Sequence, residues 1–194
     1  MTLRSTIVFL GGFATVLAAG WVGFPNLLYK SVAQPLDFNH SVHQKKASMQ
    51  CADCHSVRSD GTSAGIPATT NCSSCHAEPA GSTKNEKMLV VNWVKPGREI
   101  PWQVYSRQPV NVRFSHAVHV QLGKLACENC HGKHGASERL ARYEENRISG
   151  YSRNIWGHNI GRFTNTPGDG MKMSDCEQCH EKKGVEAGCL GCHQ

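Results

Sequence analysis

The longest apolar segment of the chain lies near its N-terminus. Residues 7–24 (IVFLGGFATVLAAGWVGF) carry no charge, and as a helix these eighteen residues span about 27 Å, close to the thickness of the hydrocarbon core of a bilayer. Arg4 precedes the segment and Lys30 follows it, with Trp21 and Tyr29 at positions where aromatic side chains meet a membrane surface. The pattern predicts a transmembrane helix with its N-terminus in the cytoplasm and the rest of the chain outside.

A cleaved signal peptide is the alternative interpretation of this segment. Ala18, Ala19 and Gly20 are small enough to form a cleavage site. We favour a retained anchor over residues 1–30, followed by one domain over residues 31–194. The location that we expect is therefore the inner membrane, with an N-terminal single-pass anchor and the domain in the periplasm.

The rest of the chain has few periodic hydrophobic patterns. Mean hydropathy is −0.41, and 39% of all residues are hydrophobic, so residues 31–194 can bury little apolar surface of their own. Good helix formers predict a helix over residues 137–148 (SERLARYEENRI), which ends before Ser149 and Gly150. Residues 89–114 combine β-branched residues with three prolines and predict an extended connector. We expect a mainly irregular fold with minor α-helix.

Ten cysteines change this picture, because all of them fall into pairs with the same spacing. Each pair has two residues between its cysteines and a histidine directly after the second one, which chance does not produce five times. The five motifs, which we number from first to fifth along the chain, are Cys51-Cys54-His55, Cys72-Cys75-His76, Cys127-Cys130-His131, Cys176-Cys179-His180 and Cys189-Cys192-His193.

This spacing suits the covalent attachment of haem. Two thiols three positions apart reach the two vinyl groups of one porphyrin and form thioethers, and the adjacent histidine binds the iron. Zinc ribbons and disulfide frameworks also use paired cysteines, but neither accounts for a histidine after every pair. We therefore predict five covalent haem c groups held by the ten cysteines. The five motif histidines are the predicted iron ligands, and the oxidising chemistry of attachment agrees with an exported domain.

One segment of the chain occurs twice. Residues 38–55 begin with Phe-Asn-His-Ser-Val-His and end on the first motif, and residues 114–131 begin with Phe-Ser-His-Ala-Val-His and end on the third. These two copies, which we call the first and the second repeat, lie 76 residues apart and have identical spacing. After the second repeat the next motif begins 49 residues on instead of 21, so residues 132–175 form an insertion.

Six histidines outside the motifs are candidates for the second axial ligands. In each repeat, two of them lie three positions apart and project from one side of a helical turn toward different irons. Five haems need five such ligands, so one histidine is left over. It is either structural or the ligand of a sixth, non-covalent haem, for which His134 and His158 in the insertion are the candidates. The six are His40, His43, His116, His119, His134 and His158.

The order of these motifs resembles that of a known family. Each repeat has Phe-x-His-x-x-His before its Cys-x-x-Cys-His, and the first repeat is followed by residues 64–69 (AGIPAT), the second motif and a connector rich in Trp and Pro. This arrangement resembles the membrane-anchored multihaem cytochrome subunit of alternative complex III and that of Qrc, the quinone reductase complex of sulfate reducers. The resemblance covers about residues 7–132 and the last two motifs, and the insertion favours the Qrc branch.

The resemblance implies an electron-transfer subunit of a membrane quinone oxidoreductase. Its partners would be a soluble periplasmic cytochrome c and the iron–sulfur and quinone-binding integral membrane subunits of the same complex. It further implies internally duplicated haem elements of the class III and cytochrome c7 kind and, for the Qrc branch, a haem count above the number of motifs. Resemblance to small multihaem cytochromes implies that His40 serves the first motif and His116 the third, while His43 and His119 reach neighbouring haems.

Two other functions fit parts of the sequence. A self-sufficient quinol dehydrogenase also has a short chain behind an N-terminal helix, and a reductase of a small oxyanion needs a haem with an open iron position. We favour the relay subunit and expect no catalytic residue, because histidines suffice for every iron and residues 7–24 contain no ionisable group for quinone chemistry. The formal charge of +6 falls to about −4 with ten haem propionates, so nucleic-acid binding has no support.

Overall fold

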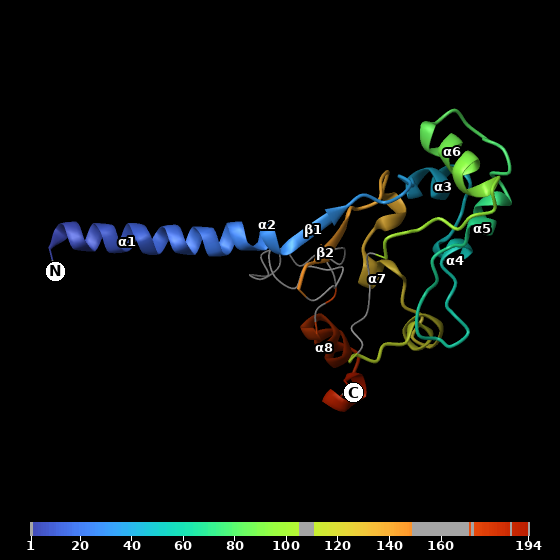
Figure 1. Ribbon diagram of the computed structural model, residues 1–194. Coiled ribbons are helices and arrows are strands. Elements are labelled where there is room, and N and C mark those ends of the chain that lie inside the picture. Colours follow the sequence, from blue (N-terminus) through green and yellow to red (C-terminus); the bar gives the residue numbers. More distant parts are fainter. Residues whose placement is uncertain (1, 105–110, 149–170, 172, 187, 194) are drawn as a thin grey trace.

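The computed structural model describes residues 2–104, 111–148, 171, 173–186 and 188–193. The chain begins with α1 (Leu3–Ala18), which continues through a π-helical segment (Ala19–Gly23) into α2 (Phe24–Leu28). Thr2 starts the helix by accepting a hydrogen bond from the backbone N–H of Ser5. The helix projects as a rod from the rest of the chain, and α1 contains no buried residue, whereas Leu28 at the end of α2 is buried (Figure 1).

The helix is long and apolar enough to cross a membrane. The qualifying span is Leu3–Trp21, which begins four residues before the segment predicted from the sequence. None of its residues is buried by the rest of the protein. An apolar helix that packs against nothing is compatible with a membrane anchor, because lipid then supplies the surroundings that a protein core would supply elsewhere.

A two-stranded antiparallel sheet follows the N-terminal helix. Strand β1 (Tyr29–Val32) pairs with β2 (Tyr143–Asn146), with Tyr29 opposite Asn146. The prediction of a helix over residues 137–148 is therefore wrong. A short segment gains little from helix propensity alone, whereas pairing with β1 supplies ladder hydrogen bonds and buries Asn146, whose side-chain oxygen accepts from the N–H of Ile148.

The remaining elements are short helices separated by irregular chain, as the sequence predicted. Helical residues lie at or beside each of the five motifs. The helical elements after β1 in the described part of the chain are α3 (His40–Lys46), α4 (Cys51–Cys54), α5 (Thr69–Ser73), α6 (Lys84–Leu89), π-helical segments at Val90–Val94 and Ala117–Leu122, α7 (Glu128–His131), a 3-10 turn at His134–Ala136, α8 (Met173–Lys182) and α9 (Cys189–Cys192).

The predicted extended connector is wrong in its first part. Instead of extended chain, α6 and the π-helical segment after it run to Val94, and they bury Leu89 and Val90. Thr83 begins this helix by accepting a hydrogen bond from the N–H of Glu86, a capping signal that the β-branched pair at Val90 and Val91 obscured. Irregular chain follows over residues 98–104, and the rest of the connector up to residue 110 lies outside the described residues.

The apolar core of the described part is small. It consists of Leu36, Leu89 and Ile100, with Trp93 and Trp102 packed against it. A core of this size buries few side chains, so the domain has little apolar interior of its own. It does, however, join α6 to α5, because Leu89 at the end of α6 packs in one cluster with Ile100, whose backbone N–H donates to the hydroxyl oxygen of Thr69 at the start of α5 at 3.1 Å.

Candidate functional site

Each repeat contacts the segment that follows the other repeat, and these two crosswise contacts are related by the sequence offset of the duplication. In one contact, the N–H of Ala117 donates to the carbonyl of Gly61 at 3.1 Å, and in the other the N–H of Ser41 donates to the carbonyl of Ser137 at 3.0 Å. Donors and acceptors are each 76 residues apart, the offset of the duplication itself. The repeats are therefore related by an approximate two-fold rotation, the arrangement by which two copies of one surface meet in a symmetric dimer.

The first and third motifs meet at the centre of this arrangement. Cys51 and Cys127, again 76 residues apart, are close enough for their thiols to form a hydrogen bond. Burial raises the pKa of the Cys51 thiol, and the adjacent Cys127 raises it further. Equivalent cysteines that touch each other must lie next to the two-fold axis, so groups attached to these two motifs would be neighbours.

Each repeat holds its two histidines against its phenylalanine. Phe38 stacks on His43 with ring centroids 4.3 Å apart and meets His40 edge-on at 4.9 Å. Phe114 stacks on His119 at 4.5 Å and meets His116 edge-on at 4.9 Å. The shared aromatic ring fixes the two imidazoles at a steep angle to each other, so they point to different places.

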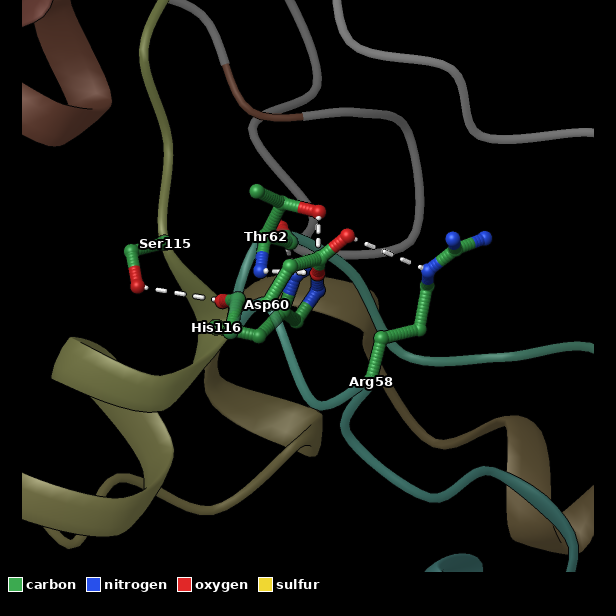
Figure 2. Close-up of polar contacts among 6 residues, drawn as sticks. Arg58, Asp60, Thr62, Ser115 and His116 are labelled. Carbon is green, nitrogen blue, oxygen red and sulfur yellow. Dashed lines mark hydrogen bonds and ion pairs between the residues drawn. The ribbon is translucent and has the colours of Figure 1, made fainter.

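Figure 2 shows the turn that orients His116. Its Nδ1 donates to the carbonyl oxygen of Thr62 at 3.0 Å, and Thr62 is held by Asp60, whose carboxylate accepts from the Thr62 N–H at 3.0 Å and from its hydroxyl at 2.7 Å. Ser115 donates to the carbonyl of Gly61 at 3.0 Å. Gly61 has φ of 71°, and a Cβ there would lie 2.9 Å from that of Ala117, so glycine is needed where the repeats approach.

Six of the candidate ligand histidines have a described contact at Nδ1. In five of them Nδ1 lies against a neutral oxygen, and in His76 it lies 3.1 Å from a carboxylate oxygen of Glu86. A proton on Nδ1 that is donated to such an acceptor leaves Nε2 with a free lone pair, which is the form that binds a metal. The five contacts are His40 with Ser137 Oγ at 3.1 Å, His43 with Asn39 O at 2.8 Å, His55 with Gly65 O at 2.9 Å, His116 with Thr62 O at 3.0 Å and His119 with Ser115 O at 2.8 Å.

Three histidines of the repeats face motif histidines across a gap that suits an iron. Ring centroids are 6.1 Å apart for His43 and His76, 6.3 Å for His116 and His131, and 6.0 Å for His119 and His180. Two imidazoles that bind one metal from opposite sides at about 2.0 Å have ring centres about 6 Å apart. The rings of the last two pairs are also nearly parallel, at 5° and 16°. The residues present thus fit haems with two histidine ligands.

His40 and His55 form a fourth neighbouring pair. The pKa of His40 is lowered to about 4, first by burial and then by the neighbouring His55, His134 and His43. An imidazole with a low pKa is neutral at physiological pH, which is the form that binds a metal. His40 is thus next to the first motif, while its partner in the helical turn, His43, is next to the second.

The other candidate histidines, His134, His158 and His193, have fewer described contacts. His134 lies near His40, in the 3-10 turn at the start of the insertion. His158 lies outside the described residues. In the described part of the chain, His193 has no ring contact with another histidine; its segment is held by a bridge to Val112, with the carbonyl of Cys192 accepting from the N–H of Arg113 at 2.7 Å. The fifth motif and the insertion are therefore the least defined part of the site.

The thiols also show which motifs are neighbours. Burial raises the pKa of the Cys72 thiol, and Cys54 of the first motif adds to this. Burial likewise raises the pKa of Cys130, with a contribution from Cys179, and that of Cys176, with contributions from Cys130 and Cys192. Together with the contact of Cys51 and Cys127, these neighbours connect the motifs in the spatial order second, first, third, fourth and fifth.

This series of motifs extends away from the N-terminal helix. Along the direction of α1, α5 and α6 at the second motif lie farthest from this helix, whereas α8 and the C-terminal end lie nearest to it (Figure 1). A cavity of about 390 Å³ lies between the first and second motifs, lined by Met49, Asp53, Cys54, Thr70, Asn71 and Ser74. The cavity is another place where the residues present leave room for a bound group.

Paired cysteines followed by histidine, small protein core and facing imidazoles define the class of multihaem cytochromes c. The chain belongs to the cytochrome c3 family, because the family profile described as cytochrome c3 matches residues 42–143, more than half of the chain. A second profile, cytochrome c7 and related cytochrome c, matches residues 112–194. These families carry haem c, which agrees with the cofactor and fold class predicted from the motifs.

A relative of known function matches almost the whole chain. It is the menaquinone reductase, multiheme cytochrome c subunit, of Nitratidesulfovibrio vulgaris, which is 36% identical over 201 residues. The alignment covers 96% of this chain and 89% of that protein. The resemblance to quinone reductase cytochrome subunits inferred from the motifs is thereby confirmed, and electron transfer in a quinone reductase complex is the function that this relationship supports.

Proposed function

We propose that the chain is the electron-relay subunit of a membrane quinone reductase complex. It would carry electrons between a soluble periplasmic cytochrome c and iron–sulfur and quinone-binding subunits in the membrane. The main observation in favour is the unbroken series of motifs in space. Each motif is next to another in the order second, first, third, fourth and fifth. The apolar N-terminal helix and the printed function of the relative agree with a membrane complex.

The ten cysteines would hold five haem c groups, which supply reversible one-electron chemistry when bound. In this proposal Cys51, Cys54, Cys72, Cys75, Cys127, Cys130, Cys176, Cys179, Cys189 and Cys192 form the thioethers. The motif ligands are His55, His76, His131, His180 and His193. Their proposed partners are His40 for His55, His43 for His76, His116 for His131 and His119 for His180, and His134 or His158 is left for His193.

The pairing assigns a distinct task to each of the two histidines of a repeat. The first histidine would serve the motif of the same repeat, and the second would serve the next motif along the chain. Because both imidazoles contact one phenylalanine, one by stacking and the other edge-on, the two irons would be held at a fixed separation. The two crosswise contacts would then fix the first repeat against the second, so that all neighbouring haems keep close and constant distances.

Purification of the detergent-solubilised chain tests the proposal. We expect iron–sulfur and quinone-binding membrane proteins to co-purify, and we expect the isolated chain to exchange electrons with a soluble cytochrome c but not with a quinol. Quinol oxidation by the isolated chain would instead favour the self-sufficient dehydrogenase. A chain that purifies alone from gently solubilised membranes, under conditions that preserve other respiratory complexes, would contradict the subunit role.

The haem count is a separate prediction. The mass of the intact chain should exceed that of the polypeptide by five haems, because five complete motifs are present. Acid–acetone extraction removes non-covalent haem and leaves thioether-linked haem on the protein. About one equivalent of haem in the extract would establish a sixth site, with His134 or His158 as its ligand. A clean extract would leave one of these two histidines structural, and a covalent count below five would refute the attachment assignment.

The topology is tested with intact spheroplasts. Added protease should remove the haem domain and leave a short protected fragment that contains α1, because Leu3–Trp21 is the span suited to a membrane in the described part of the chain. The matched sample is a lysed preparation, in which cytoplasmic marker proteins are also cleaved. Release of the whole chain by a salt wash would show peripheral attachment instead of a spanning anchor.

A further inference from the structure

Among the six candidate ligands with a described Nδ1 contact, one differs from the other five in the group that its Nδ1 faces. Nδ1 of His76 lies 3.1 Å from Oε1 of Glu86, whereas the five contacts described above end on neutral carbonyl or hydroxyl oxygens. Both side chains are largely buried, with 21% of His76 and 12% of Glu86 exposed. A carboxylate that is largely shielded from water lies against a candidate iron ligand, so its charge can act strongly on that ligand.

The surrounding chain holds this carboxylate in place. Glu86 lies in the first turn of α6, where Thr83 caps the helix, and its Oε1 also accepts the N–H of Ala80 at 2.7 Å. Its other oxygen would lie 2.8 Å from a Cβ at Gly81, so any larger residue there would displace it. The loop before α6 thus forms a pocket that fixes Glu86 against the second motif.

In the part of the chain that the structure describes, the histidine has no alternative partner. Nδ1 of His76 is buried and, among the described residues, makes no hydrogen bond of good geometry, so Glu86 is the acceptor within reach. The His76 ring is also turned 57° from that of His43, while the comparable angles are 5° and 16° at the third and fourth motifs. A modest rotation of the imidazole would direct its N–H at the carboxylate.

We propose that Glu86 is a positioning residue that, by accepting the Nδ1 proton of His76, sets the reduction potential of the haem at the second motif below those of the other motifs. The proposal rests on the relay function above. A hydrogen bond to a charged acceptor is about twice as strong as one to a neutral acceptor, and it makes a metal-bound imidazole a stronger electron donor. Stronger donation stabilises ferric iron over ferrous iron, and the nearby negative charge acts in the same direction.

The location of Glu86 in the series of motifs relates this effect to the direction of electron transfer. The second motif is at the end of the series that lies farthest from the anchor (Figure 1). A low potential at this end makes electron transfer toward the other motifs, and so toward the membrane, favourable. Glu86 would therefore favour entry of electrons at the second motif and their movement toward the anchor.

The test compares Glu86→Gln with Glu99→Gln in the purified, fully haem-loaded chain. Glutamine at 86 still accepts the N–H of Ala80 but removes the charge from His76. Glu99 accepts the N–H of Thr69 at 2.8 Å near the same motif and has no contact with a candidate ligand ring, so its variant removes an equal charge without touching the imidazole. Both variants are also made in a His43→Met background, where a methionine-ligated ferric haem at the second motif alone gives a distinct absorption band.

We expect Glu86→Gln to raise one potential by the equivalent of at least a tenfold change in the reduction equilibrium, about 59 mV for one electron. The ferric low-spin EPR signal of that haem should change as well, and Glu99→Gln should leave that signal unaltered. An equal or larger shift in Glu99→Gln, or unchanged potentials and EPR signals in Glu86→Gln with all five haems present, would overturn the role of Glu86 and leave the relay proposal standing. Failure of the chain to undergo reversible reduction at all would instead refute the relay proposal.

Discussion

Replacing His43 with methionine is expected to raise the reduction potential of the second-motif haem by on the order of 0.1 V, since axial ligands set haem potentials over a range of ~0.8 V and methionine favours ferrous iron. The physical reason is the position of His43, whose ring centre lies 6.1 Å from that of His76 although Cys51 and Cys54 are the nearest cysteines that follow it in sequence. A potentiometric titration followed by EPR measures the change.

The duplication supplies a matched variant. His119 occupies the equivalent position in the second repeat, and its ring centre lies 6.0 Å from that of His180. His119→Met should therefore alter the fourth-motif haem and leave the second unchanged. If His43→Met affects only the first-motif haem, His43 does not bridge to the second motif and the proposed pairing is wrong.

Removing the first-motif haem by Cys51→Ala with Cys54→Ala should reduce electron transfer through the complex to near background. Cys51 lies against Cys127 of the third motif, and Cys54 lies beside Cys72 of the second, so the first motif is the connection between these two. Electron tunnelling falls exponentially with distance, and loss of this haem would leave a wide gap between the second and third motifs. The measurement is the rate at which the complex reduces a quinone when a reduced soluble cytochrome c supplies the electrons.

Two controls make this result interpretable. Met49→Leu changes the lining of the cavity beside the first motif without removing a thiol, and it should retain all haems and most of the rate. The double alanine variant should retain the remaining haems and its association with the membrane subunits. An undiminished rate in a variant shown to lack the first-motif haem would mean that electrons do not pass through this motif.

The attachment motifs could be predicted from the sequence because they are local. A thiol, two intervening residues, a second thiol and a histidine carry their chemistry within five positions, and the spacing of His40 and His43 places both on one helical turn. What orients these histidines is not local. The Nδ1 of His40 lies against a hydroxyl 97 residues away, and no pattern along the chain indicates such a contact.

Secondary structure shows the same limit. Residues 137–148 contain good helix formers, yet four of them pair with a strand that begins more than a hundred positions earlier, because tertiary contacts outweigh weak helix propensity. The helix at α6, by contrast, carried a readable signal in Thr83 and Glu86, three residues apart at its start. Glu86 became a functional candidate only when the fold placed it against His76.

The crosswise contacts between the repeats have a consequence for how the protein matures. A chain that is exported behind an N-terminal anchor delivers Thr62 to the outside 54 residues before His116, so Thr62 is already outside when the second repeat emerges. His40 leaves the export channel 97 residues before Ser137, so its ring stays without its orienting hydroxyl until the second repeat has emerged. The attachment machinery would then act first on a motif whose distal ligand is still unplaced, and the first motif would reach its final coordination only after the second repeat has emerged.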